Sequence, residues 1–569
     1  MKKTQHKIIS TALALLLTFV LLLTALCGCR LYSRKTFDYN EIVYTRPNVN
    51  NIKTALQRAA AEAKSNDLYS VNKAVNSAMT ALNDFVGDYY YVNIEYNKDK
   101  RAYADEFSWM TTAYNEIMNE YYAMMYAYLQ SDFADALFAG MSEADIEYIV
   151  SRNQSASPEY TALVNEISAL QQEYALLEYS EMTAEYVYAV EDIIVALAKK
   201  LNAQAIMDGY DSYKEKAYAL KYGRAYTPEQ AKAIRNSVKT HISPILNDLY
   251  DYETLRAQAD LIATQREQGR SGYSSAGGST RAVNYDDSHI RYALDNGIIK
   301  ALANEVSPLA GEAYDYLMEY NLYNLSDPVA YPNRSGSSFT VFLPKQQAPY
   351  MIVNCDGSPL DISTFVHEFG HYTSFYKHGP QGGSDLDVAE IHSQGLEALF
   401  ADYWRRMYLP DVADAIIEEW LFNTTFFSIT LGCLFDEFLD EIFTNPSAYS
   451  SDGQVTALFD RMIEEYNADE YFDILSDING MDYSYWWASV SHNIDSPFYY
   501  ISYAMSAIPA LTIYEDSATD RAVAIREYNV VVAYGDGAYT FEEVLQIAGI
   551  ASPFNDSTIR TLAQFLKNQ

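Results

Sequence analysis

The residues best suited to chemistry in this chain lie in one pentapeptide, His367-Glu368-Phe369-Gly370-His371. Residues four apart share a face of an α-helix, so His367 and His371 can direct both imidazoles at one metal ion. Glu368 lies beside them, where its carboxylate can take a proton from a water bound to zinc. Zinc lowers the pKa of such a water towards neutrality. The pentapeptide therefore predicts the centre of a metal-dependent hydrolase.

A helix must carry this pentapeptide, and the sequence predicts one over Asp361–Tyr376. Asp361 is expected to cap its start, and the apolar residues Phe365, Val366 and Phe369 are expected to pack it inward. A zinc peptidase site also needs a third protein ligand and an open fourth position for water.

The third ligand is expected on a second helical pattern, which brings Glu390 nineteen residues after His371. Glu390 and Glu397 are seven residues apart and share a face of that helix. His378 and His392 are alternative ligands in principle. We rank them lower because His378 falls at the end of the first helix and His392 points away from the face of the two glutamates.

These residues resemble the thimet-oligopeptidase and oligoendopeptidase F family of zinc peptidases. That family carries HExGH and then a helix of the form E-x-x-S-Q-x-x-E, which the sequence Glu390-Ile-His-Ser-Gln-Gly-Leu-Glu397 fits. The resemblance implies that His367, His371 and Glu390 hold one Zn²⁺ and that Glu368 is the general base. Glu397 either orients a ligand imidazole or is an ordinary surface carboxylate.

A third match lies near the C-terminus, where His492 precedes Tyr499, Tyr500 and Tyr503. It looks like the family's histidine and tyrosine-rich helix, whose side chains face the scissile peptide. The resemblance implies that His492 and one or more of the tyrosines donate hydrogen bonds to the oxyanion. Tyr499 and Tyr503 rank above Tyr500 because residues i and i+4 share a helical face. The chain has 52 tyrosines, so packing is the alternative role.

The N-terminus predicts export and a membrane anchor. A basic start, Met1–Lys7, precedes the uncharged apolar run Ile8–Leu26, and Cys27-Gly28-Cys29 follows. Leu three residues before a cysteine and Gly immediately before it form the pattern of a bacterial lipoprotein signal, so Cys29 is expected to be lipidated. An uncleaved transmembrane anchor is the alternative, because the run is nearly long enough to span a bilayer. Either way, the protein is expected outside the cytoplasm, held at the membrane.

The composition of the chain argues against some classes of binding partner and against a disulfide framework. The chain has 40 basic and 76 acidic residues, a net charge of −36, which argues against a nucleic-acid partner because phosphate binding needs clusters of lysine and arginine. Beyond the two N-terminal cysteines only Cys355 and Cys433 remain, so no disulfide framework is expected. Spacing leaves their pairing open, and we expect Cys355 to be a buried free thiol.

The fold is expected to be mainly α, a multi-helix peptidase fold with a small β-sheet beside the zinc helix. The family resemblance adds a deep cleft between helical lobes. Helical patterns cover Ala55–Lys64, Ala102–Gln130, Glu159–Tyr179, Pro228–Ile242 and Ile245–Arg266, and strand patterns cover Ser338–Leu343 and Tyr350–Asn354. The expected organisation is a signal peptide at 1–29, a tether at 30–47, an N-terminal helical region at 48–270, a flexible Ser/Gly loop at 271–288 and a zinc catalytic region at 289–569. That loop is either an inert surface segment or a flap over the cleft.

The function expected from all of this is that of a membrane-anchored, extracytoplasmic zinc endopeptidase that hydrolyses short peptides. A zinc carboxypeptidase of similar helical fold is one alternative, although no convincing pair of arginines lies near the motifs to hold a substrate's terminal carboxylate. Arg405 and Arg406 are interpreted as surface charges. A peptide-binding lipoprotein without catalysis is the other alternative, but it predicts a damaged HExxH motif, and here the motif is intact.

Overall fold

The computed structural model describes residues 38–65, 67–138, 141, 146, 149–150, 153, 158–177, 182–249, 252, 256, 287–325, 334, 338–355, 357–479 and 482–569. The signal peptide with Cys29, the first part of the tether and nearly all of the 271–288 loop lie outside these ranges. Within them, the structure contains no helix that combines the length and the apolar character needed to cross a bilayer.

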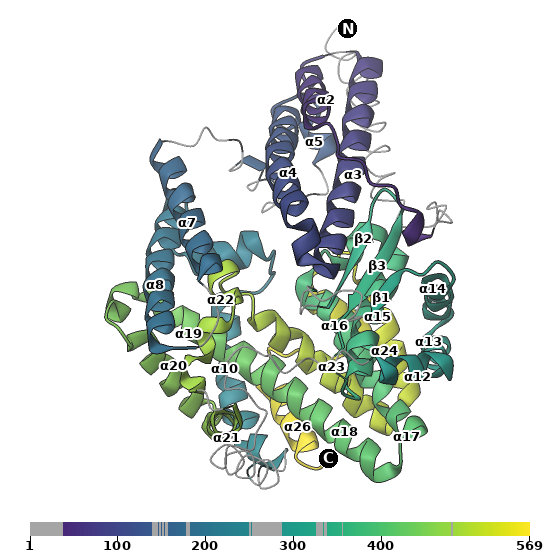
Figure 1. Ribbon diagram of the computed structural model, residues 1–569, viewed down its shortest axis with the longest axis vertical. Helices are drawn as coiled ribbons and strands as arrows, with labels where there is room; N and C mark the ends of the chain where they lie inside the picture. Colours follow the sequence, from purple (N-terminus) through teal and green to yellow (C-terminus); the bar gives the residue numbers. More distant parts are fainter. Residues whose placement is uncertain are drawn as a thin grey trace.

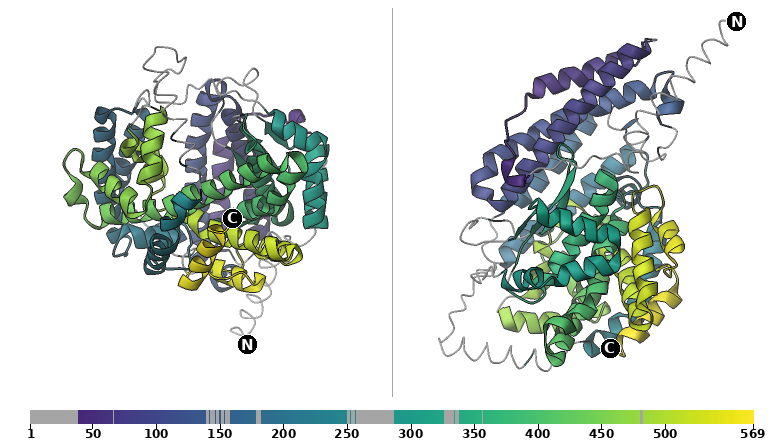
Figure 2. Two further views of the ribbon diagram at one scale, coloured as in Figure 1. Left: turned by 90° about the horizontal axis from the view of Figure 1, so that it is seen from below. Right: turned by 90° about the vertical axis from the view of Figure 1, so that its right-hand side faces the viewer.

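The first three long helices pack side by side at one end of the molecule (Figures 1 and 2). They are α2 (Val49–Glu62), α3 (Leu68–Lys98) and α4 (Lys100–Leu129). Asp99 alone separates α3 from α4, and its carboxylate accepts hydrogen bonds from the backbone N–H groups of Arg101 and Ala102. An aspartate that caps a helix in this way allows the chain to reverse within one residue. These helices enclose a hydrophobic core of their own.

The next helices share their core with the C-terminal half of the chain. They are α7 (Pro158–Leu176), α8 (Ala184–Met207) and α10 (Pro228–His241). Thr227 and Gln230 form a capping box at the start of α10, as suits the predicted start at Pro228. Of the predicted helix Ile245–Arg266, the structure describes mainly its first residues, which lie in the 3₁₀-helix η3 (Ser243–Asp248).

A three-stranded sheet lies against the helix that carries the pentapeptide. Its strands are β1 (Tyr323–Leu325), β2 (Phe339–Leu343) and β3 (Ala348–Val353), in the order β1-β3-β2. β3 is buried throughout; it pairs parallel with β1 and antiparallel with β2. The prediction of a small sheet beside that helix is confirmed. β1 was not predicted, since three residues are too short for an alternating pattern.

Tyr39, the first aromatic residue that the structure describes, fixes the start of the ordered chain to this sheet. Its ring stacks on Tyr350 of β3 with centroids 4.0 Å apart, and its hydroxyl donates to Glu95 Oε1 over 2.8 Å. Lys98 places its ammonium 4.4 Å from the Tyr39 ring centroid and pairs with Glu95 at 2.7 Å. Tyr39 is 4% exposed, so the tether is held at this point.

Three helices meet behind the sheet: α15 (Asp361–His378), α16 (Leu386–Phe400) and α23 (Ile501–Thr519). α16 packs against both of the others and against α24 (Arg521–Tyr534). One detail of α15 differs from the prediction. Asp361 is the first helical residue and not the cap, and its carboxylate accepts from the backbone N–H of Gly357 at 2.9 Å.

The remaining helices complete a mainly α fold, as predicted. They are α5 (Ala134–Leu137), α9 (Tyr213–Lys216), α12 (Ser288–Asp295), α13 (Ile298–Val306), α14 (Pro308–Glu319), α17 (Trp404–Met407), α18 (Pro410–Asn423), α19 (Leu431–Thr444), α20 (Gln454–Glu465), α21 (Asp469–Asn479), α22 (His492–Asp495), α25 (Phe541–Ala548) and α26 (Asp556–Leu566). Cys355 and Cys433 are both buried and are not joined. The expected domain boundaries and the deep cleft stay predictions.

Candidate metal centre

His367, His371 and Glu390 converge on one point between α15 and α16. Their ligand atoms all lie within 4.8 Å of one another. Glu390 Oε2 is 3.5 Å from His367 Nε2 and 3.6 Å from His371 Nε2. Three ligands of one tetrahedral zinc, each about 2.0–2.2 Å from the ion, stand about 3.3–3.6 Å apart. The two histidines and the carboxylate therefore fit a zinc ion in both donor type and separation.

Gly370, between the two histidines, allows α15 and α16 to come this close. A Cβ atom at this position would lie 2.2 Å from the backbone oxygen of His392 and 2.7 Å from the Cα of Ser393. Both atoms belong to the backbone of α16 and cannot move aside as a flexible side chain could. The glycine thus sets the distance from which Glu390 reaches the two imidazoles.

A chain of two hydrogen bonds orients His367. Its Nδ1 lies 2.8 Å from Glu397 Oε1, and Trp420 Nε1 of α18 donates to Glu397 Oε2 over 3.0 Å. Burial alone would lower the pKa of His367, but the hydrogen bond and charge of Glu397, with the charges of Glu390 and Glu368, outweigh it and raise that pKa to about 9. Of the two roles left open for Glu397, its position favours orienting the imidazole over that of a surface carboxylate.

Glu390 is held in its charged form by its neighbours. Ser393 Oγ, one turn along α16, donates to Glu390 Oε2 over 3.0 Å. Burial works against ionisation of the carboxyl, yet the nearby His371 and His367, with Ser393, lower the pKa of Glu390 to about 2. An ionised, buried carboxylate facing two imidazoles is a suitable ligand for a divalent cation.

Glu368 faces the edge of the sheet. Thr340 of β2 donates from its hydroxyl to Glu368 Oε2 over 2.7 Å and to the Glu368 backbone oxygen over 3.0 Å. Burial raises the pKa of Glu368, which favours its taking up a proton. The sequence did not single out Thr340 or Trp420, because an isolated Thr in a strand and an isolated Trp in a helix carry no motif.

The two alternative ligands lie elsewhere. His378 Nε2 contacts the backbone oxygen of Val532 of α24 at 2.7 Å, and burial lowers the pKa of His378. His392 is fully buried, and a Cβ placed on Gly535 would meet its Nε2 at 2.2 Å. Neither belongs to the cluster of His367, His371 and Glu390 that the described residues form.

His492 and the three tyrosines gather as one aromatic group. The His492 ring lies 4.8 Å from Tyr499, 5.5 Å from Tyr500 and 6.4 Å from Tyr503, centroid to centroid. Burial raises the pKa of Tyr499 to about 12, and the charge of Glu390 adds to it. Burial also raises the pKa of Tyr503, again with a contribution from Glu390. Tyr500 lies 5.0 Å from Phe435, among packing side chains.

The helix expected over Tyr499–Tyr503 starts later than predicted. α23 begins at Ile501, so Tyr503 lies on it while Tyr499 stands before it. Phe498 has a φ of +69°, outside the helical region, and this interrupts the chain between α22 and α23. Tyr499 and Tyr503 are nevertheless neighbours, with ring centroids 5.4 Å apart.

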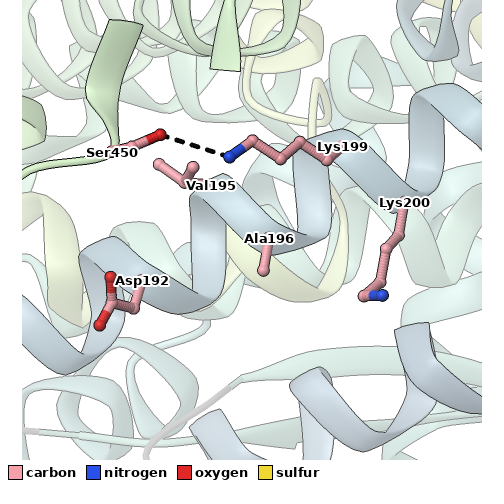
Figure 3. A pocket seen from close by; sticks show the side chains of 6 residues that line it. All are labelled: Asp192, Val195, Ala196, Lys199, Lys200 and Ser450. Carbon is pink, nitrogen blue, oxygen red and sulfur yellow. Dashed lines mark hydrogen bonds between the residues drawn. The ribbon is translucent and has the colours of Figure 1, made fainter. Parts of the chain in front are cut away.

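A hollow elsewhere on the surface lacks such chemistry. Figure 3 shows its lining, which comes from α8 and from Ser450, and its volume is about 350 Å³. Lys199 donates to Ser450 Oγ over 3.3 Å, and Asp192 is the carboxylate among the lining residues. No histidine or cysteine lines it, so the chemistry of the chain points to the metal cluster.

Comparisons with known proteins give a family match and several similar folds. Residues 323–564 match the model of peptidase family M3. This range includes the sheet, the metal cluster and the aromatic group, and it confirms the resemblance that the motifs indicated. Peptidases of this family are metallopeptidases. The comparison with curated proteins found no match.

Solved structures share the fold along nearly the whole chain. PZ peptidase A with an inhibitor is 22% identical, has a TM-score of 0.68, and matches 93% of this chain and 98% of its own. A protein assigned as an oligoendopeptidase F is 20% identical with a TM-score of 0.70 over 94% of this chain and 98% of its own. Another so assigned, from Bacillus anthracis, is 18% identical with a TM-score of 0.65 over 94% and 97%. At these identities the likeness establishes the fold.

Proposed function

We propose that this chain is a zinc endopeptidase that hydrolyses short peptides. The observation that carries the proposal is the convergence of His367, His371 and Glu390 within 4.8 Å beside the buried Glu368. Two histidines and a glutamate form the ligand set of many catalytic zinc sites, which keep a fourth position open. The family match supports peptide hydrolysis as the reaction.

The side chains of this site divide the proton transfers and the charge stabilisation between them. A zinc ion bound here would acidify a water and polarise the scissile carbonyl. Glu368 takes the proton of the attacking water and later delivers it to the leaving amine. Thr340 holds the Glu368 carboxylate in place through its hydroxyl. His492, Tyr499 and Tyr503 donate hydrogen bonds to the developing oxyanion.

The edge of the sheet supports an extended peptide as substrate. β2 is an outer strand of the sheet, and its Thr340 contacts Glu368 directly. An extended peptide can add to such an edge through backbone hydrogen bonds, which do not depend on its sequence or on its ends. This mode of binding suits an endopeptidase that acts on short, unfolded peptides.

A carboxypeptidase receives less support. It needs a cation that holds the terminal carboxylate, and Arg405 and Arg406 do not offer one. Both side chains are half-exposed; Arg405 pairs with Asp414 at 2.8 Å, and Arg406 lies 4.0 Å from Glu305. We also propose that the enzyme works outside the cytoplasm, anchored by a lipid on Cys29, as the N-terminal sequence predicts.

Cleavage of a peptide library tests the function. Residues 30–569 are incubated with mixed peptides of about ten residues, with a chelator and after return of zinc, and the products are read by mass spectrometry. Internal cleavage that the chelator abolishes and zinc restores is the expected result. Release of single C-terminal residues would indicate the carboxypeptidase, and peptides that bind but stay intact would indicate a binding protein.

Replacing Glu368 by Gln tests the assignment of the general base. The amide can neither take up nor deliver the proton, so kcat should fall by about 10²–10⁴-fold while zinc stays bound. Peptide turnover and zinc content are measured on the same samples. Glu418→Gln, at an exposed position of α18, is the matched control and should leave both values unchanged. Substantial turnover by Glu368→Gln at full zinc content would assign the base to another group.

A further inference from the structure

A short segment of the N-terminal half donates hydrogen bonds to the backbone that leads into the aromatic group. It begins at Lys221, the last residue of the π-helical turn η2 (Ala217–Lys221). Lys221 donates to the backbone oxygen of Asp495 over 3.1 Å, and Tyr222 donates from its hydroxyl to that of Pro497 over 2.8 Å. Arg224 donates from Nη2 to that of Phe498 over 2.9 Å. We call Lys221, Tyr222 and Arg224 the carbonyl clamp.

The clamp acts where the backbone is strained. Phe498 is fully buried and has a φ of +69°, in the left-handed region that L-residues with a side chain rarely adopt. Such a conformation persists only where the surroundings hold it. It also directs the next residue, Tyr499, out of the line of α23. The hydrogen bond from Arg224 to the Phe498 oxygen is therefore in a position to fix Tyr499.

Arg224 links this backbone to the helix of the third metal ligand. Its guanidinium lies between the rings of Tyr218 and Tyr222, 4.5 Å from each centroid, and Nη2 also donates to Ser502 Oγ over 2.8 Å. Its Nε is 4.0 Å from Asp387 Oδ2, on α16 one turn before Glu390. One side chain thus contacts both the tyrosine segment and the start of α16.

Not every nitrogen of the buried Arg224 guanidinium is hydrogen-bonded. We infer that the main role of Arg224 is not to stabilise the fold. Nε and Nη1 are buried and have no hydrogen-bond partner among the described residues, although Nε lies 4.0 Å from Asp387. A buried guanidinium with unpaired nitrogens costs free energy of folding. The hydrogen bonds that Arg224 does form fix the orientation of the backbone at Phe498 and Tyr499.

We propose that Arg224, with Lys221 and Tyr222, is a positioning residue for peptide hydrolysis and holds Tyr499 and its neighbours His492 and Tyr503 in place. The inference rests on the proposed function and adds to it a part that lies outside the matched region 323–564. Arg224 is not one of the residues of the metal cluster. It acts through the backbone that carries the donors to the oxyanion.

Arg224→Lys tests the proposal, because a lysine keeps the charge but cannot reach both Phe498 and Ser502. A displacement of a donor by about 1 Å costs up to about 10²-fold in rate, so kcat should fall by about 10–10²-fold with KM within about threefold. Zinc content should not change. Arg235→Lys is the matched control: Arg235 is also buried, 1% exposed, but pairs with Asp436 and Asp440 of α19. It should lower the Tm and leave kcat unchanged.

Double variants distinguish positioning from a general loss of structure. If Arg224 acts through the tyrosines, Arg224→Lys should cost much less kcat when Tyr499 or Tyr503 is already Phe. If Arg224→Lys lowers kcat by the same factor in both tyrosine variants as in the wild type, the proposal is wrong. A milder variant, Tyr222→Phe, removes one hydrogen bond to the Pro497 oxygen and should lower kcat by about fivefold. It gives the same test where Arg224→Lys fails to fold, and an unchanged kcat would overturn the clamp.

Hydrogen exchange provides a readout that does not need catalysis. Amides of residues 495–503 should exchange faster in Arg224→Lys than in Arg235→Lys. Wild-type protein that cleaves peptides while Arg224→Lys keeps full kcat overturns the positioning role and leaves the proposed function standing. A zinc-loaded wild type that cleaves no peptide overturns the proposed function, and the catalytic part of this inference falls with it.

Discussion

His367 shows how far the metal centre extends beyond its ligands. With Nδ1 against Glu397, the ring directs Nε2 towards Glu390, 3.5 Å away. Trp420 in turn fixes Glu397, so the orientation of a ligand depends on an indole on a different helix. The sequence predicted the three ligands, Glu368 and an orienting role as one option for Glu397. Thr340 and Trp420 could not be predicted, because only the folded chain brings them to the site.

Breaking this chain of contacts should weaken metal binding. Outer partners of ligand imidazoles typically contribute 10–100-fold to metal affinity, so Glu397→Gln should raise the Kd for zinc by about that factor. Trp420→Phe should raise it by less, since Glu397 remains. Competition with a chromophoric chelator measures both values. Trp487→Phe removes another buried indole, which donates to Thr456, and serves as the control. An unchanged zinc Kd in Glu397→Gln would mean that the carboxylate does not orient His367.

Among the elements, those with strong periodic patterns were predictable and those fixed by tertiary contacts were not. The predicted strand Ser338–Leu343 is observed as Phe339–Leu343, and the predicted helix from Asp361 reaches His378. The break before α23 was missed because a phenylalanine gives no local signal for a positive φ. Its conformation depends on Arg224, which is 274 residues away in the sequence.

Gly370→Ala tests how closely α15 and α16 must approach. The added methyl would meet backbone 2.2 Å away, and ordinary contact requires a shift of about 1 Å, beyond the tolerance of about 0.2 Å for metal–ligand distances. The variant should fold and lose zinc, as measured by circular dichroism and metal analysis. In Gly311→Ala of α14 the new Cβ comes too close only to the side-chain oxygen of Asn304, 2.4 Å away, and this side chain can turn away. If both variants retained full zinc, α15 and α16 would be able to move apart without loss of metal binding.

The start of α16 should make stability depend on pH. Asp385 caps the helix by accepting from the Val388 N–H at 3.1 Å. Burial and the charge of Asp387 raise the pKa of Asp385 to about 7. A carboxyl whose pKa is raised on folding stabilises the protein below its ordinary pKa near 4 and loses that contribution as the pH rises through about 7. Asparagine caps equally well without this loss.

Asp385→Asn should therefore raise the Tm more at pH 8 than at pH 5, with both proteins held in chelator at constant ionic strength. Asp482→Asn replaces an exposed cap, which accepts from the Ser484 N–H at 3.0 Å, and should give no such trend. A Tm difference that is the same at both pH values would mean that Asp385 is not the group that titrates.

The whole molecule is built around contacts that connect its two halves. α8 and α10 of the N-terminal region share one core with the catalytic helices, whereas α2, α3 and α4 enclose another. Sequence patterns indicated which segments are helical but carried no information on which helices share a core, because pairing depends on side chains hundreds of residues apart.

Anchoring at the membrane is a property of the whole chain, and Cys29 tests it. Cys29→Ala should abolish incorporation of labelled fatty acid and leave the signal peptide attached. Gel mobility, lipid labelling and the N-terminal mass of membrane-extracted protein measure this. Cys27→Ala is the control and should be processed normally. Unmodified Cys29 in the mature, membrane-extracted protein would contradict the lipoprotein prediction.

Because Tyr39 is attached to β3, an anchor at Cys29 would limit the distance between the sheet and the membrane. Ten residues lead from Cys29 to Tyr39, and a fully extended chain spans at most about 3.5 Å per residue, or about 35 Å in all. Once Cys29 is in the bilayer, the sheet beside the metal centre can stand no farther than this from the lipid surface at its point of attachment. A folded domain is about as wide as that gap, whereas an extended peptide passes through it easily. The length of the tether would then limit the size of the substrates that can enter between the protein and the membrane. This limit would be separate from any selectivity within the site.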